Sequence, residues 1–272
     1  MMSSKNKGEQ ARHEREVMKA VSEFFNNPAS DCFFGFTHDD KRELTEVFEK
    51  LKQNEETTYP DFFGPHGCVE LFRISSSREG RKGGPKQQIE DGKLISEVNR
   101  DDKSEELGAP AARQYCRVRP AHSYEALTEH LRKQFSKHLE SMRKGEFDSA
   151  LTVFVVELAD PDLECMFVPT NRTVPDGISF GGLWPAYSGE ERLGLYRLSR
   201  DRENLQWLAR QGKGVHYVIF LGPAGIEAIN LRRVEVLVPF LPWDLVACGK
   251  TGCTVVESIP ISGQWEVLNE YH

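Results

Sequence analysis

The spacing of apolar residues along the chain predicts four helices. In each segment apolar side chains recur every three or four residues, so that they share one face of a helix. The clearest segment has Leu127, Leu131 and Phe135 on that face. Another begins in the pattern of a capping box, because Asp40 stands three residues before Glu43. The predicted helices cover residues 13–25, 41–53, 123–143 and 201–210.

Runs of β-branched and aromatic residues predict the strands of a sheet. Residues 151–158 are apolar at both odd and even positions, which indicates a strand buried on both faces. Two extended runs, 58–63 and 68–76, flank a Gly-Pro-His-Gly sequence that is typical of a reversal. Because helices and strands alternate with reversals between them, we expect an α/β or α+β fold with a mixed β-sheet flanked by helices. Further strands are predicted at residues 165–168, 215–221, 226–231 and 234–238.

The length of 272 residues allows one large domain or two small ones. Residues 1–30 are predicted to form an N-terminal helical appendage, residues 31–170 an α/β core, and residues 171–272 a C-terminal α/β extension packed on the same sheet. Residues 78–113 are rich in Ser, Gly, Pro and charged residues, which predicts a mobile insertion in the core, with a short helix near residues 94–98.

Composition and charge argue against two classes of protein, those with a basic surface throughout and those that span a membrane. Hydrophobic residues make up 39% and charged residues 28% of the chain, which is usual for a folded globular protein. With a net charge of −7 the whole surface cannot act as a polycation, although a local basic patch can still bind nucleic acid. The longest apolar runs, 151–158 and 234–241, are shorter than the roughly 20 residues that a membrane-spanning helix needs. Since residues 1–16 also lack the apolar stretch of a secretion signal, we expect a cytoplasmic protein without a membrane partner.

The six cysteines are scattered along a chain that is large enough to form its own core. This distribution predicts reduced, mostly buried thiols and not a disulfide framework. Cys248 and Cys253 bracket Gly-Lys-Thr-Gly, but a zinc site needs a second pair of ligands. A metal site at these two cysteines is therefore not expected.

Acidic residues on neighbouring predicted strands are the main candidates for chemistry. Glu70 shares a strand face with Cys68 and Phe72, because alternate residues of a strand point the same way. A carboxylate in such an apolar row needs a cation, a hydrogen-bond donor or a proton. Asp61 lies across the reversal, so the two carboxylates could converge on one hard divalent cation, Mg²⁺ or Mn²⁺. Glu43, at the edge of an apolar helix face, is the candidate for a third carboxylate.

Residues 41–160 carry these features in a definite order. A helix with a glutamate is followed by a Pro-Asp strand, a strand with a glutamate, a basic amphipathic helix and a buried strand. This order resembles the PD-(D/E)xK nuclease superfamily. The resemblance implies a restriction-endonuclease-like core in which Asp61 and Glu70 hold magnesium, and in which Glu43 is the acid of the first helix.

The chain departs from that family in its lysine. The family places a lysine two positions after the second acid, where it assists the attacking water, but this chain has Phe72 there. Arg73 points to the other strand face, so Lys82 and Lys86 in the predicted insertion are the candidates to replace it. One strand before the second helix is also missing from the pattern, unless residues 115–118 pair into the sheet. The Pro-Asp-Phe, Gly, Glu, Phe and Ser-Ser pattern is similar to that of uncharacterised bacterial proteins, which implies no activity by itself.

Two functions follow from these residues. One is a metal-dependent phosphodiesterase that hydrolyses DNA or RNA with a water activated on magnesium. The other is a non-catalytic α/β protein that binds a protein partner or nucleic acid, for example through its Trp-rich C-terminal part. In this second view Asp61 accepts hydrogen bonds from a turn, and Glu70 lies at a sheet edge with its carboxylate in water.

Basic and aromatic residues outside the acidic pair have ordinary structural interpretations as well. Some basic residues could contact phosphates, but the favoured interpretation places them in a solvated loop and on the solvent face of a helix. His138 falls within the apolar face of its helix and is interpreted as a buried, hydrogen-bonded histidine. Trp184 and Trp243 are interpreted as packing anchors. The basic residues in question are Arg78, Arg81, Lys82 and Lys86 in the predicted insertion, and Lys133, Lys137 and Lys144 on the third predicted helix.

We predict that limited proteolysis cuts first within residues 78–109. The apolar content of this stretch is too low to offset the entropy of ordering it. Mass spectrometry of the early fragments locates the cuts. Hydrogen-exchange protection of these residues equal to that of the sheet would contradict the prediction.

Overall fold

The structure is a computed structural model that describes most of the chain. The predicted insertion at residues 78–113 lies outside the described residues except for Arg113, so Lys82, Lys86 and the predicted short helix near residues 94–98 are not described, and neither is Trp184. Backbone alone is described for residues 113–118, 253–261 and 264–270. The described residues are 4–26, 32–54, 59–77, 113–118, 122–145, 151–159, 163–170, 172, 192–241, 243–250, 253–261 and 264–270.

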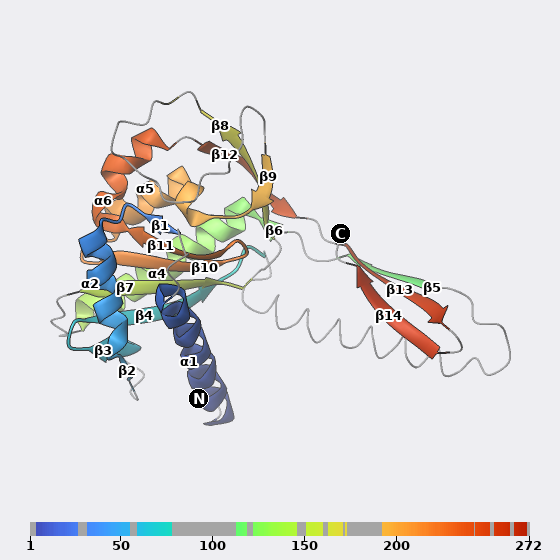
Figure 1. The fold of residues 1–272 in the computed structure, drawn as a ribbon, viewed down its shortest axis with the longest axis horizontal. Helices are drawn as coiled ribbons and strands as arrows, with labels where there is room; N and C mark the ends of the chain where they lie inside the picture. The colour runs from blue at the N-terminus through green and yellow to red at the C-terminus, as the bar shows by residue number, and fades with distance from the viewer. Residues whose placement is uncertain are drawn as a thin grey trace.

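A mixed sheet forms the centre of the described part of the chain, with strand order β1-β11-β10-β7-β4-β3-β2 (Figure 1). The middle strand β7 pairs in parallel with β4 and with β10. The hairpins β3–β4 and β10–β11 add antiparallel pairs, which confirms the predicted mixed sheet and the reversal after residue 63. These strands are β1 (Phe33–Phe34), β2 (Lys52–Gln53), β3 (Phe62–Gly64), β4 (Gly67–Ile74), β7 (Thr152–Leu158), β10 (Tyr217–Gly222) and β11 (Gly225–Asn230).

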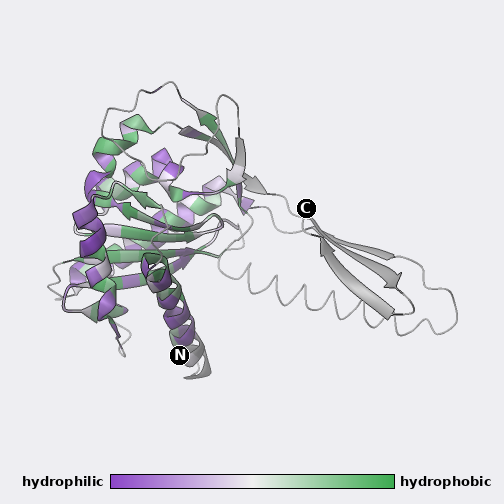
Figure 2. Cartoon of the chain, in the orientation of Figure 1, coloured by the Kyte–Doolittle hydropathy of each residue, from purple (hydrophilic) through white to green (hydrophobic). Residues whose placement is uncertain are grey.

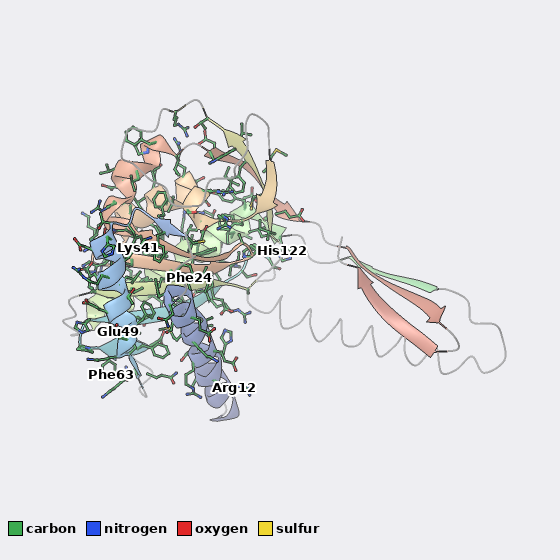
Figure 3. All side chains as sticks on the ribbon, viewed as in Figure 1. Arg12, Phe24, Lys41, Glu49, Phe63 and His122 are labelled. Carbon is green, nitrogen blue, oxygen red and sulfur yellow. The ribbon has the colours of Figure 1, made fainter. Side chains whose placement is uncertain are left out.

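Helices cover both faces of this sheet. Val153 and Val155 of β7 lie in an apolar cluster with α1 and α2, whereas Phe154 and Val156 lie in a second cluster with α4, α5 and α6. In Figure 2 the central strands are mostly in the hydrophobic colours, whereas hydrophobic and hydrophilic residues alternate along the helices. Phe24 of α1, labelled in Figure 3, packs against the sheet. The helices are α1 (Ser4–Asn26), α2 (His38–Glu49), α4 (Tyr124–Lys144), α5 (Arg202–Gln211) and α6 (Leu231–Leu237).

Two smaller sheets accompany the central one within the described ranges. One has the order β6-β12-β8-β9 and contributes Cys165, Phe167 and Trp243 to the cluster under α4 and α5. The other has the order β14-β13-β5. Residues 115–118 therefore pair with β13 and do not supply the missing strand of the central sheet. The strands are β5 (Arg113–Val118), β6 (His122–Ser123), β8 (Glu164–Pro169), β9 (Arg192–Leu195), β12 (Trp243–Lys250), β13 (Cys253–Ile261) and β14 (Gln264–Glu270).

The predicted strand at residues 234–238 is wrong, because these residues belong mostly to helix α6. The Asn230 side chain caps the helix by accepting a hydrogen bond from the amide of Arg232. Leu231, Val234 and Leu237 are buried at a spacing of three residues. A strand would bury every second residue, so the burial itself shows the helical period.

Helix α2 begins and ends earlier than predicted. Its capping box joins Thr37 to Asp40, so Asp40 lies in the first turn and is not the cap. Because the helix ends at Glu49, Lys52 and Gln53 are free to pair with β3 as the edge strand β2. The apolar pattern of the sequence does not predict this two-residue strand.

We predict that Val155→Asp unfolds the protein. Val155 is fully buried in the middle strand, where a carboxylate finds no partner, and the substitution costs about 4 kcal/mol or more of unfolding free energy. The matched control is Val236→Asp, because Val236 is 66% exposed on α6. Thermal denaturation checks both variants. A cooperative transition of Val155→Asp within a few degrees of the control would contradict the burial of this strand.

Candidate functional site

Asp61 and Glu70 lie beside each other on the β3–β4 hairpin. Phe62 pairs with Val69, so Asp61, which directly precedes β3, is brought opposite Glu70. The amide of Asp61 donates a hydrogen bond to Glu70 Oε2 at 3.2 Å. The amide of Leu71 donates to Asp61 Oδ2 at 2.8 Å. The structure therefore joins the two acidic residues that the sequence singles out.

Glu70 is buried in the interior of the sheet. It lies on β4, between β3 and β7, and is only 5% exposed. The expectation of a Glu70 carboxylate in water at a sheet edge is therefore wrong. Asp61 does accept a backbone hydrogen bond, but its donor is Leu71 of strand β4 and not the amide of a turn.

His138 of α4 completes the contacts of Glu70. Its Nδ1 lies 2.5 Å from Glu70 Oε1, and its side chain is 16% exposed. The imidazole stacks on the ring of Phe72, with the ring centroids 4.7 Å apart. The interpretation of His138 as a hydrogen-bonded histidine is confirmed, and its side chain is partly buried. Phe72 occupies the position at which the nuclease superfamily that the sequence resembles has a lysine. Its ring packs on the His138 imidazole, which in turn contacts Glu70.

The environment of Asp61 disfavours its charge. Burial, followed by the negative charge of Glu70, raises the pKa of Asp61 to about 7. The hydrogen bond from the Leu71 amide acts in the opposite direction but is outweighed. A neighbouring cation would relieve the same repulsion between the two carboxylates.

Glu14 of α1 is a third acidic group near the pair. Its charge also raises the pKa of Asp61, and its Oε2 accepts a hydrogen bond from Gln53 of β2 at 3.0 Å. Sequence reasoning missed this residue, although it stands three residues before Val17 and seven before Val21, on the same helix face. The helical pattern gives that face but does not say which part of the sheet it covers.

Glu43 does not join the acidic pair. It lies on α2, which shares a face of the sheet with α1, but its carboxylate is engaged by residues of β10 and α6 and not by the hairpin. Its carboxylate accepts hydrogen bonds from Tyr217 and from Arg232, the latter at 2.6 Å. Burial opposes ionisation, but these hydrogen bonds lower the pKa of Glu43. Its role in the structure is to tie α2 to α6, since Asp40 contacts the same arginine.

Among the described residues, no lysine or arginine forms an ion pair with Asp61 or Glu70. Arg73 lies on the other face of β4, as expected, with its Nε 3.6 Å from Glu157 Oε2. His13 of α1 contacts the same glutamate at 2.8 Å. Lys82, the candidate for the missing lysine, lies outside the described residues.

The donor set at the pair is small. Within the described ranges, no group of three His, Cys, Asp or Glu side chains is arranged to hold a metal ion. Two carboxylates nevertheless suit Mg²⁺, which keeps several waters and is commonly bound through one or two acidic side chains. An ion at this pair would take two protein ligands, Asp61 and Glu70, and the described residues supply no third.

Comparison with known proteins identifies no relative of this chain. No family model, curated protein or solved structure matches it. No helix in the described part of the chain is long and apolar enough to cross a membrane. The interpretation of the site therefore rests on its own geometry.

We predict that Asp61 makes stability fall as pH rises in metal-free buffer. With a pKa near 3.8 when unfolded and about 7 when folded, Asp61 loses its proton first in the unfolded state. The free energy of unfolding then decreases between about pH 4 and 7, by up to about 4 kcal/mol, and this decrease is absent in Asp61→Asn. Urea denaturation across this range measures it.

The control for this experiment is Asp39→Asn, because the Asp39 side chain is 81% exposed. It should follow the pH profile of the wild type. A stability difference between wild type and Asp61→Asn that stays constant from pH 4 to 8 would show that Asp61 titrates normally.

Proposed function

We propose that the protein is a phosphodiester hydrolase that acts on DNA or RNA with Mg²⁺ or Mn²⁺ held by Asp61 and Glu70. The observation that carries this proposal is the buried carboxylate pair of Asp61 and Glu70, in which burial and then the charge of Glu70 raise the pKa of Asp61. The order α2, β2, β3, β4, α4 and β7, with β4 parallel to β7, also agrees with the order that the nuclease resemblance implies.

Each residue of the site has a distinct task in this proposal. A bound divalent ion would supply an activated water and neutralise charge on the phosphate. Glu70 is held in place by His138 and by the Asp61 amide, so its carboxylate is oriented in advance. Asp61 is held by the Leu71 amide. Preorganised ligands of this kind lower the cost of binding an ion.

The helix that carries His138 also supplies positive charge. Lys133, Lys137 and Lys144 are exposed on α4. Exposed lysines on one helix can contact backbone phosphates without reading the sequence of a nucleic acid. They support a substrate with a phosphodiester backbone.

The alternative function is non-catalytic binding of a protein or nucleic acid, and it is favoured by Phe72 in the lysine position. In the structure, two of the tryptophans that this alternative would use as a binding surface pack against other residues of the protein. Trp243 is 4% exposed, and Trp207 packs against Phe135 with the centroids 5.8 Å apart. Trp243 belongs to the core, which confirms it as a packing anchor, and Trp207 is partly buried against the same core.

We predict that millimolar Mg²⁺ raises the melting temperature of the wild type. An ion that binds the native state at about ten times its dissociation constant adds about 1.4 kcal/mol, or roughly 3 °C. Asp61→Asn and Glu70→Gln should abolish the rise and any metal-dependent cleavage of labelled DNA or RNA. Differential scanning calorimetry and isothermal titration of Mg²⁺ measure the binding.

Glu43→Gln is the matched control, since the Glu43 carboxylate is engaged by residues of β10 and α6 and not by the hairpin. It should retain the heat of metal binding. If the wild type gives no heat that depends on Asp61 and Glu70, the hydrolase proposal fails. If it binds metal but cleaves neither nucleic acid, the binding alternative replaces it.

A further inference from the structure

Cys165 and Cys248 stand directly opposite each other on two antiparallel strands. Cys165 lies on β8 and Cys248 on β12, and the register of the two strands pairs them. Directly opposite residues of an antiparallel pair have their Cα atoms about 4.5 to 5.5 Å apart, within the range that a disulfide spans. Backbone geometry therefore places the two cysteines at bonding distance.

The two thiols also face the same side of this sheet. Cys165 is 2% exposed and lies in the apolar cluster under α4 and α5, and Cys248 packs against that cluster. A hydrogen bond with the Cys248 thiol, followed by burial, raises the pKa of Cys165. Both thiols are reduced in the structure.

The sequence pattern directs attention to a different pair. Cys248 and Cys253 are close along the chain, but the register sets Cys253 opposite Val118 in another sheet. Cys165, about 80 residues before Cys248, is the cysteine that the fold brings to it. Only the strand pairing reveals this partner.

We propose that Cys165 and Cys248 form a reversible disulfide when the protein meets a peroxide. The modification site is separate from the acidic pair and independent of the proposed hydrolase activity. It ties β8 to β12 and so fixes the register of the sheet that they share.

The chemistry proceeds in two balanced steps. Cys248 is partly exposed, so its sulfur attacks hydrogen peroxide first: an S–O bond forms, the O–O bond breaks and one water leaves. The Cys165 sulfur then attacks the sulfenic acid, the S–O bond breaks, and a second water leaves as the S–S bond forms. Two electrons pass from the two thiols to the peroxide.

The disulfide should stabilise the fold. Closing a loop of about 80 residues restricts the unfolded chain strongly, so the oxidised protein should melt several degrees higher. A reductant such as dithiothreitol should reverse the shift. A rise in melting temperature therefore distinguishes an intramolecular disulfide from overoxidation of the thiols. Overoxidation adds oxygen atoms to sulfur but closes no loop.

The test treats the full chain with hydrogen peroxide and maps its peptides by mass spectrometry without reduction. We expect a linked pair of peptides containing Cys165 and Cys248, and a protein mass lower by two hydrogen atoms. Cys165→Ser should stop at a sulfenic acid on Cys248, which dimedone traps. The control Cys32→Ser, at another partly exposed cysteine, should form the link as the wild type does.

Two results would overturn the inference. One is a wild type in which dimedone traps Cys248 as fully as in Cys165→Ser, because no resolving thiol would then be within reach. The other is a link from Cys248 to Cys253. If Cys165→Ser fails to fold, Cys248→Ser tests the same pair from the more exposed side, and it should prevent both the link and the rise in melting temperature.

Discussion

The parallel pairing of β7 with β4 and with β10 dictates the path of the rest of the chain. Parallel neighbours cannot be joined by a tight turn, so the chain must cross a face of the sheet between them. Helix α4 lies on the path from β4 to β7, and α5 lies on the path from β7 to β10. The crossing by α4 carries His138 over Glu70. The contact between His138 and Glu70 is thus a product of the topology of the central strand.

Periodicity predicts those parts of the fold that have a long, regular pattern. The strand around Val155, the helix around Leu131 and the β3–β4 hairpin follow from apolar spacing and turn residues. The apolar run around Val234 is compatible with a short strand or a buried helix, and only the Asn230 cap and the packing decide in favour of the helix. Strand β2 is two residues long and has no period to detect.

The acidic pair could be predicted because its members lie on one hairpin, where sequence spacing fixes which residues face each other. The third acidic residue near the pair could not be predicted in this way. Glu43 and Glu14 both border apolar helix faces, but the two helices reach different places along the sheet, which no local pattern encodes. The same applies to Cys165 and Cys248, whose pairing depends on the register of strands far apart in the sequence.

Both edges of the central sheet consist of two-residue strands, β1 and β2. A long edge strand would present a row of unpaired backbone groups on which another molecule could add a strand. Here β1 and β2 themselves offer only a few such groups, and β2 also carries the exposed Lys52. Strands as apolar as β7 and β10 lie two or more places inside these borders. The molecule can contain a highly aggregation-prone interior and still resist growth into sheets shared between copies.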